Sequence, residues 1–327
     1  MGKRIVWIDA FKGFLIALVV LGHALQSILG DACEDNIVWR LIYSFHMPCF
    51  IMLSGLFAPR NVQNIGALGK IVGRRCAQLL IPMLCWQAIY HIVPPHYEVS
   101  LGSFIDCGVY WFLWALFFIT VIFVVAEYLA TIFSCKSWII HIAIIVILFG
   151  IMVLLNYREH GVQYIAYYYP YYVFGSYYHQ KMSEKSGGMA IYLIGLVIWF
   201  VAALFWNMHE PPVFLKVAAI PSSLMCYAYR YVVAVLAIVV FYGLAKRLLS
   251  EENLISSSLK RIGLLSLGVY TIHIVLIKLV RLLMPISINS TLLVICLWLI
   301  ALLLSYLIAE VLKRNRITSS LLLGKIK

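Results

Sequence analysis

The sequence predicts an all-α integral membrane protein with about ten transmembrane helices and with both termini in the cytoplasm. Of its 327 residues, 64% are hydrophobic and only 12% are charged, whereas a soluble domain carries about 25% charged residues. The mean hydropathy is +0.97, and apolar runs near the roughly 20 residues that cross a bilayer recur along the whole chain. No stretch is left for a separate soluble domain, so we expect residues 1–327 to form a single membrane domain.

Hydropathy and the positions of polar residues divide the chain into the expected spans. These spans are 9–29, 40–58, 76–93, 109–130, 138–155, 163–180, 189–206, 226–246, 263–284 and 290–312. The polar segment from Glu251 to Ser258 is expected to be an inner loop between the eighth and ninth spans.

The net charge of +12 reflects the expected topology. Most Lys and Arg residues fall in alternate short loops, which are cytoplasmic if the N-terminus is inside, and the acidic residues gather in the other loops. A nucleic-acid partner would need a basic polar face, which this distribution lacks. The eight cysteines form no CxxC pair, so no metal site is expected.

Three ionisable side chains interrupt the first span. Asp9 and Lys12 lie one helical turn apart near its inner end, and His23 lies 14 residues beyond Asp9, or about 21 Å further along the helix axis. A charged side chain at the centre of a membrane helix costs about 2.5 to 3.5 kcal/mol. Each of the three is therefore a functional hypothesis, and the Asp9–Lys12 pair and His23 belong to separate sites.

The second span runs in the opposite direction and carries His46 near its outer end. If the first two spans pack as antiparallel neighbours, His23 and His46 lie at the same depth. Two imidazoles in an apolar cavity could supply a general base near neutral pH, or they could only join two helices through a hydrogen bond. In the same span Pro48 is expected to disturb the helix, and Ser54-Gly55 to allow close backbone approach.

Two further groups of side chains point to ligands. Lys70, Arg74 and Arg75 precede the third span; they either anchor the helix on its inner side or bind the phosphates of a cytosolic donor. The sixth span has eight tyrosines around Pro170 and Gly175. Those at its ends suit the membrane interface, and those in its middle could line a polar cavity that holds a sugar. In the ninth span, Lys278 and Arg281 can extend outward, which leaves His273 as the buried residue.

The segments that carry these residues resemble those of a known family. The opening KRIVWIDAFKGFLIALVVLGHAL, Lys3 to Leu25, resembles the first helix of the membrane acyltransferase 3 family, with its basic residue, Asp, basic residue with Gly, and outer His. FHMPCFIMLSGLFAPR, Phe45 to Arg60, is similar to the second helix of the family. YWFLWALFF, YYPYYVFGSYY and SLGVYTIHIVLIK follow in the family order, so the resemblance covers nearly the whole chain and looks closest to the fucose 4-O-acetylase-like branch.

The resemblance implies transfer of an acyl group, by default acetyl from cytosolic acetyl-CoA, to a carbohydrate hydroxyl of an envelope or exported glycan at the inner (plasma) membrane. It makes His23 the catalytic histidine, Asp9 a supporting position, and Lys12, Arg74 and Arg75 donor ligands. In the mechanism we expect, His46 polarises or orients one of the reacting groups. The family often has a second Arg where this chain has Gln78. The residues expected to hold the acceptor are Trp111, Trp114, Tyr168, Tyr171 and His273. Membrane lipid is an expected partner, and protein partners are not indicated.

Two other classes of membrane protein remain as alternatives. In a proton-coupled secondary transporter of a sugar-like solute, buried His and Asp side chains would relay protons and the tyrosine-rich span would bind the sugar. Paired broken helices in two related halves are typical of such transporters, and the sequence has no such internal symmetry. In a purely structural membrane protein, the histidines and cations of the first three spans would have no evident role.

Overall fold

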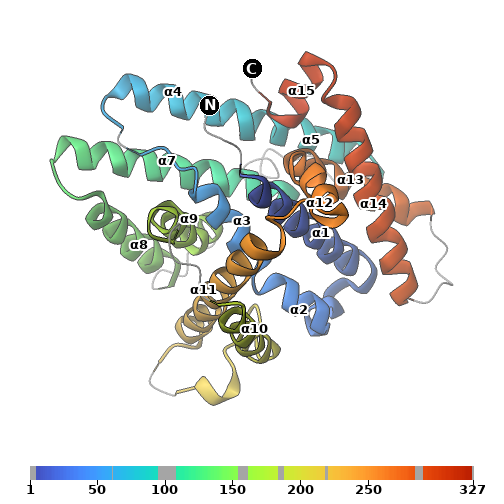
Figure 1. The fold of residues 1–327 in the computed structure, drawn as a ribbon, viewed down its shortest axis with the longest axis horizontal. Helices are drawn as coiled ribbons and strands as arrows, with labels where there is room; N and C mark the ends of the chain where they lie inside the picture. The colour runs from blue at the N-terminus through green and yellow to red at the C-terminus, as the bar shows by residue number, and fades with distance from the viewer. Residues whose placement is uncertain are drawn as a thin grey trace. The chain divides into compact units, whose positions relative to one another are not determined.

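The computed structural model describes residues 5–60, 62–94, 108–153, 161–182, 188–217, 220–283 and 290–325. Helices make up most of these ranges, and none of them contains a β-strand (Figure 1). The chain divides into two compact units. Unit 1 comprises Met1–Phe50 and Met182–Leu307, and unit 2 comprises Ile51–Lys181 and Ile308–Lys327. The expectation of one domain over residues 1–327 stays a prediction.

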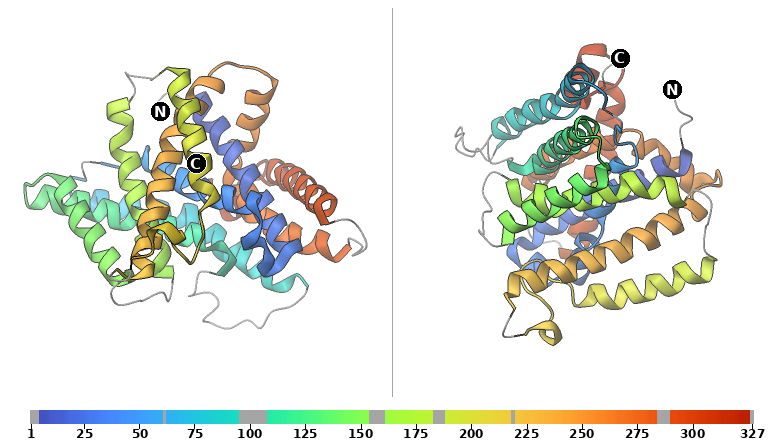
Figure 2. Two further views of the ribbon diagram at one scale, coloured as in Figure 1. Left: turned by 90° about the horizontal axis from the view of Figure 1, so that it is seen from below. Right: turned by 90° about the vertical axis from the view of Figure 1, so that its left-hand side faces the viewer.

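Unit 1 is built around the first helix, α1. Its helices are α1 (Val6–Leu29), α2 (Ile37–Tyr43), the first turn of α3 (His46–Gly55), α10 (Met189–Leu204), α11 (Ser222–Leu248), α12 (Leu254–Gly263), α13 (Ser266–Leu283) and most of α14 (Ser290–Leu312), with short 3-10 turns at Gly30–Asp35 and Val213–Leu215. The blue α1 packs along the orange α12 and α13 (Figures 1 and 2).

Two glycines allow α1 and α12 to pack backbone against backbone. A Cβ atom at Gly13 would lie 1.9 Å from the carbonyl oxygen of Leu259, and one at Gly263 would lie 1.7 Å from that of Asp9. Only glycine fits such a contact, and close approach through small residues is a usual way for membrane helices to associate. The glycine that follows Lys12 thus has a packing role.

The segment Glu251 to Ser258 is not wholly a loop, and this expectation was wrong. The side chain of Asn253 accepts a hydrogen bond from the backbone N–H of Ser256, and the Ser256 hydroxyl in turn accepts one from the N–H of Asn253. This reciprocal capping satisfies two backbone donors and starts α12 within the polar stretch. The segment is polar because its side chains cap a short helix, one side of which faces α1.

Unit 2 contains the end of α3 and the middle of the chain. Its other helices are α4 (Ile65–Arg75), a π-helical turn (Cys76–Leu80), α5 (Ile81–Ile92), a 3-10 turn (Gly108–Tyr110), α7 (Trp111–Ile132), α8 (Ser137–Val153), α9 (Val162–Met182) and α15 (Arg316–Leu323). A Cβ at Gly55 would lie 2.1 Å from the carbonyl oxygen of Tyr172, and one at Gly175 would lie 2.1 Å from that of Met52. The close backbone approach expected at Ser54-Gly55 is therefore confirmed.

The break in the second span is also confirmed. Helix α2 ends at Tyr43, residues 44 and 45 form a turn, and α3 begins at His46. Pro48 has no amide hydrogen, and its ring would clash with the carbonyl of Ser44 in a continuous helix. The proline is instead accommodated in the first turn of α3, where helix amides have no intrahelical partner.

Six helical segments in the described part of the chain are long and apolar enough to cross a membrane. They are Val6–Asp35, Ile37–Gly55, Gly108–Ile132, Ser222–Leu248, Ser266–Leu283 and Ser290–Leu312. Two shorter apolar helices, Ser137–Val153 and Met189–Leu204, match the fifth and seventh expected spans. The expected span 76–93 consists of the π-helical turn and α5, and the expected span 163–180 is the tyrosine-rich α9. The count of ten and the cytoplasmic placement of both termini stay predictions.

Candidate active site

Three histidines of unit 1 lie together, and we call His23, His46 and His273 the histidine cluster. The rings of His23 on α1 and His273 on α13 are 5.2 Å apart between centroids. His46, at the start of α3, lies close enough to His23 to interact with it electrostatically, as does His273. His23 is half-buried, whereas His46 and His273 are only 3% and 0% exposed. His23 is therefore the most exposed member of the cluster.

The backbone fixes the protonation pattern of the two buried rings. His46 Nδ1 lies 2.7 Å from the carbonyl oxygen of Ile42, and His273 Nδ1 lies 3.0 Å from that of Val269. A carbonyl oxygen can only accept, so Nδ1 must carry the hydrogen in both rings. In the neutral state each ring is left with a lone pair on Nε2, which can take up or hold a proton.

Two aromatic side chains, Tyr43 and Trp39, pack beside the cluster. The ring of Tyr43 meets the ring of His46 edge-on at 4.9 Å, and Trp39 stacks on Tyr43 at 3.9 Å. The Tyr43 hydroxyl donates a hydrogen bond of 2.9 Å to Gln26 Oε1, and the Gln26 side chain is also a hydrogen-bond partner of His23. The cluster therefore has both aromatic rings and the Gln26 amide beside it.

Asp9 and Lys12 lie near the other end of α1. Lys12 Nζ is 3.9 Å from Asp9 Oδ1, and both side chains are partly exposed. The pair lies beside the close crossing of α1 and α12, and 14 residues of helix separate Asp9 from His23. The structure therefore does not bring Asp9 to the histidine cluster.

The expected donor ligands Arg74 and Arg75 belong to unit 2. Arg74 is exposed at the end of α4, and Arg75 is half-buried. Arg75 Nη1 donates a hydrogen bond of 3.3 Å to Gln78 Oε1, within a π-helical turn that covers Cys76–Leu80. Such turns are often found at functional sites. Arg75 also lies within electrostatic reach of Tyr172 on α9.

The expected sugar-binding aromatics of unit 2 pack against one another. The indole of Trp111 stacks with Tyr164 at 4.5 Å and with Tyr168 at 5.4 Å, and Trp114 meets Phe118 edge-on at 4.5 Å. Trp111, Trp114 and Tyr168 keep part of their surface exposed, whereas Tyr171 is only 1% exposed. The first three have solvent-accessible surface, and Tyr171 is part of the core.

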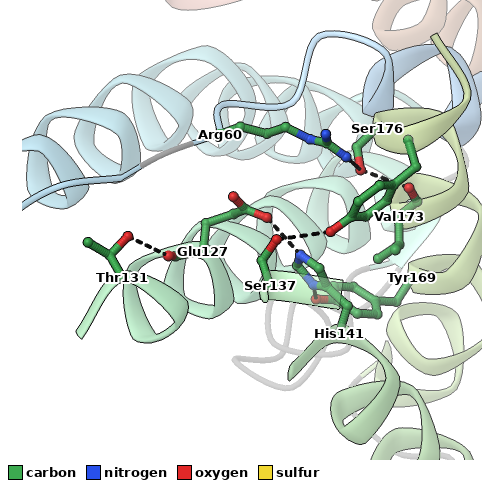
Figure 3. Close-up of polar contacts among 9 residues, drawn as sticks. Arg60, Glu127, Thr131, Ser137, His141, Tyr169, Val173 and Ser176 are labelled. Carbon is green, nitrogen blue, oxygen red and sulfur yellow. Dashed lines mark hydrogen bonds and ion pairs between the residues drawn. The ribbon is translucent and has the colours of Figure 1, made fainter. Parts of the chain in front are cut away.

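Sequence reasoning missed a buried polar network in unit 2 (Figure 3). His141 on α8 bonds through Nε2 to Glu127 Oε1 on α7 at 3.0 Å, and through Nδ1 to the hydroxyl of Tyr169 on α9 at 2.8 Å. Glu127, His141 and Tyr169 are 4%, 0% and 0% exposed. We call these three residues the Glu-His-Tyr network. The signal in the sequence was the presence of Glu127 and His141 inside apolar spans.

Polar contacts of α9 continue about two helical turns beyond Tyr169 (Figure 3). The Tyr177 hydroxyl and Ser137 Oγ are 2.9 Å apart, and the guanidinium of Arg60 lies 3.9 Å from the centroid of the Tyr177 ring. Arg60 also donates a hydrogen bond of 3.2 Å to Ser176 Oγ. Hydrogen bonds and a cation–π contact thus join α7, α8, α9 and the segment after α3.

Comparison with known proteins identifies the family. The family model described as "Acyltransferase domain", of the acyltransferase 3 type, matches residues 5–310. The chain belongs to the acyltransferase 3 family. The resemblance noted in the sequence is thereby confirmed, and the domain accounts for nearly all of the chain.

Two curated relatives of this acyltransferase 3 chain carry the name "Nodulation protein NolL". The one from Sinorhizobium fredii is 32% identical over 219 residues, which are 62% of this chain and 57% of the relative. The one from Mesorhizobium japonicum is 30% identical over 191 residues, 55% of this chain and 49% of the relative. The chain thus spans about half the length of the curated relatives it matches. No solved structure matches it.

The positions of the family's first-helix pattern can now be compared with their contacts in α1. Of the first-helix positions of the acyltransferase 3 pattern, Arg4 lies outside the described residues, Asp9 and Lys12 form an ion pair, and Gly13 packs on α12. His23 is the pattern position that meets other ionisable rings. Where the chain departs from the family, Gln78 accepts a hydrogen bond from Arg75, so it can orient Arg75 although it carries no charge.

Proposed function

We propose that this protein is a membrane O-acyltransferase that moves an acyl group, acetyl by default, from cytosolic acyl-CoA to a carbohydrate hydroxyl, with His23 as general base. The observation that carries the proposal is the histidine cluster, in which a half-buried imidazole meets two buried ones whose Nε2 atoms hold lone pairs. The protein acts in the plasma membrane, which is the inner membrane where a cell also has an outer membrane.

The reaction needs a base, and then an acid, at the same place. His23 removes the proton of the acceptor hydroxyl as its oxygen attacks the thioester carbonyl. The tetrahedral intermediate collapses, the C–S bond breaks, and the departing CoA sulfur takes the proton back from His23. His46, held by Ile42, orients one of the reacting groups. No net proton is consumed, so one imidazole serves both steps.

The donor needs cations for its phosphates. The expected donor ligands Lys12, Arg74 and Arg75 fill this role, because Arg binds phosphate in bidentate fashion and Lys acts as a point charge. Asp9 holds Lys12 in place through their ion pair. Gln78 keeps Arg75 in one orientation. The reaction uses no metal ion.

The acceptor is a carbohydrate of an envelope or exported glycan. Trp111, Trp114 and Tyr168 present partly exposed aromatic surface, which suits the apolar faces of sugar rings, as Trp and Tyr combine an apolar ring with a polar end. The alternative is a proton-coupled transporter of a sugar-like solute, which would use the same aromatic residues. Family membership over residues 5–310 favours transfer over transport.

Product analysis tests the proposal. Purified protein in nanodiscs is incubated with [14C]acetyl-CoA and a panel of methyl glycosides and membrane glycan extract, and acetylated carbohydrate is identified by mass spectrometry. We expect an O-acetyl ester on at least one acceptor, released by mild base. If folded protein transfers acetyl to no acceptor but carries sugar across proteoliposomes, transport replaces acyl transfer.

Topology completes the proposal. Both termini lie in the cytoplasm, ten spans cross the membrane, and residues 1–327 form a single acyltransferase domain. Single cysteines placed before α1 and after α15 in a cysteine-free variant would be labelled by a membrane-impermeant maleimide only after the membrane is opened. Labelling of either terminus in intact cells would contradict this topology.

A further inference from the structure

One nitrogen of the histidine cluster stands without a partner. His273 Nε2 is enclosed and has no hydrogen-bond partner, although the other ring nitrogen of His273 is held by Val269. The residue is 0% exposed, so bulk water does not satisfy this nitrogen. Of the three rings of the cluster, it is the only one in the described structure with a ring nitrogen that is both enclosed and unpartnered.

An unsatisfied buried acceptor destabilises a protein, and in a native structure it calls for an explanation. Two explanations fit a lone pair beside a catalytic imidazole. The nitrogen either receives a hydrogen bond from a substrate hydroxyl, or it receives one from the neighbouring ring during the reaction. The burial of His273 separates these explanations, because a substrate reaches the half-buried His23 and not the enclosed ring behind it.

We propose that His273 is a positioning residue that acts through His23: its Nε2 accepts a hydrogen bond from a ring N–H of His23. The inference rests on the proposed function, and it changes the role of His273 from acceptor binding to support of the base. The two ring centroids are 5.2 Å apart with the planes tilted by 42°, a separation that an N–H···N hydrogen bond between the edges of two imidazoles can span. The Nδ1–H bond to Val269 holds His273 in the tautomer that keeps the lone pair on Nε2.

The bonds in this arrangement balance. The hydroxyl O–H bond breaks and a new N–H forms on the ring nitrogen of His23 that faces the acceptor. The other ring nitrogen of His23 keeps its own hydrogen and donates it to His273 Nε2. The imidazolium formed in the transition state is stabilised by that hydrogen bond, as a base is stabilised by the group that orients it. When the CoA sulfur takes the proton, His23 returns to the neutral form.

Gln26 is the competing candidate for the same role, since its side chain is also a partner of His23. It lies on α1 and is held by the Tyr43 hydroxyl, whereas His273 comes from α13. The two candidates can be tested in parallel with the same design.

A double-mutant cycle on kcat tests the inference. Acetyl-CoA turnover with the best methyl glycoside of the panel is measured for His273→Leu, His273→Gln and Gln26→Leu, each with His23 intact and with His23→Ala. We expect His273→Leu to lower kcat about tenfold, the value of one hydrogen bond near 1.4 kcal/mol, with little change in the KM of either substrate. His273→Gln, which keeps an acceptor near the Nε2 position, should recover most of the rate. In the His23→Ala background, His273→Leu should cost nothing further.

Three results would overturn the inference. An equal loss from His273→Leu in both backgrounds would show that His273 does not act through His23. A higher acceptor KM with unchanged kcat would make it a substrate ligand, and coupling of Gln26 alone would give Gln26 the role. Folding of each variant is checked by size exclusion, and His209→Ala, an exposed histidine of unit 1, is the matched control.

A measurement without turnover separates the inference from the proposed function. In protein labelled with [15N]histidine and reconstituted in lipid, His273 Nε2 should resonate as an unprotonated nitrogen, and its resonance should move in His23→Ala. A protonated Nε2, or a resonance indifferent to His23, contradicts the inference even if acyl transfer is confirmed. Absence of acyl transfer to every acceptor, with the expected resonances, would overturn the proposed function instead.

Discussion

Two buried histidines, one in each unit, differ in how they are held. Both ring nitrogens of His141 in unit 2 are bonded, one to Glu127 and one to Tyr169. His273 in unit 1 has one bonded nitrogen and one without a partner. A buried network with every member satisfied makes helix packing specific and rigid, whereas an unpartnered nitrogen is suited to a bond that forms only during a reaction. The contrast agrees with a packing role for His141 and with the positioning role proposed for His273.

The largest stability effect is expected when the Glu-His-Tyr network loses its central member. His141→Leu removes the imidazole partner of the buried Glu127 carboxylate, and breaking such a buried pair typically costs about 3–5 kcal/mol. The free energy of unfolding in mixed micelles, followed by tryptophan fluorescence, measures this loss. In Glu127→Leu/His141→Leu most of it should return, because no buried charge is left uncompensated. If His141→Leu instead folds normally but loses turnover, the contrast between the two histidines is broken.

Substitution of a proposed donor ligand should change KM, whereas substitution in the histidine cluster should change kcat. Arg75→Ala in unit 2 is expected to raise the KM for acetyl-CoA about tenfold, since hydrogen bonds to charged groups are worth about 1.5–3 kcal/mol. Its kcat should change little, in contrast to substitutions in the histidine cluster. Gln78→Leu, which removes the acceptor of the Arg75 bond, should show the same pattern more weakly. A fall in kcat at unchanged KM would place Arg75 in the chemical step and not in donor binding.

A smaller effect is expected at the crossing of α1 and α12. Gly263→Ala places a Cβ where it would meet the Asp9 carbonyl oxygen at 1.7 Å, and overpacking of this kind typically costs about 1–3 kcal/mol. Gly175→Ala makes the equivalent change in unit 2, against Met52. Both should lower the free energy of unfolding, and a comparison of turnover in the two variants shows which crossing supports catalysis. Gly150→Ala, with open space at its Cβ, is the control.

The smallest effect is expected at an exposed ion pair of unit 1. Lys216 Nζ lies 2.9 Å from Glu210 Oε2, and this hydrogen bond holds the pKa of the Glu210 carboxyl below its usual value. The stabilisation is therefore present above the ordinary glutamate pKa and is lost as the pH falls through the lowered one. Because the pair is solvent-exposed, Lys216→Ala should leave thermal stability at pH 7 nearly unchanged. A large loss there would show that exposed pairs matter as much as the Glu-His-Tyr network.

Much of the first two helices could be predicted from the sequence. Hydropathy and the positions of polar residues predict α1. If the next span crosses the same bilayer in the opposite direction, His46 lies at the same membrane depth as His23. The break before α3 follows from Pro48, and the close approach at Gly55 follows from its missing Cβ.

Other parts depend on tertiary packing that no local pattern reveals. Nothing in the sequence of α13 says that it packs on α1, so the sequence could not place His273 beside His23. The start of α12 was missed because Asn253 and Ser256 suit both loops and caps. Glu127 and His141 lie on neighbouring spans, and only the packing of α7 against α8 joins them.

Acetyl-CoA turnover by wild-type protein and by His23→Ala, in nanodiscs at matched folding, tests the central claim most directly. Release of free CoA that depends on a carbohydrate acceptor should fall by about 10²–10⁴-fold in His23→Ala, the usual contribution of a general base, while His209→Ala keeps the full rate. Equal turnover by wild type and His23→Ala would contradict the assignment of the base to the histidine cluster.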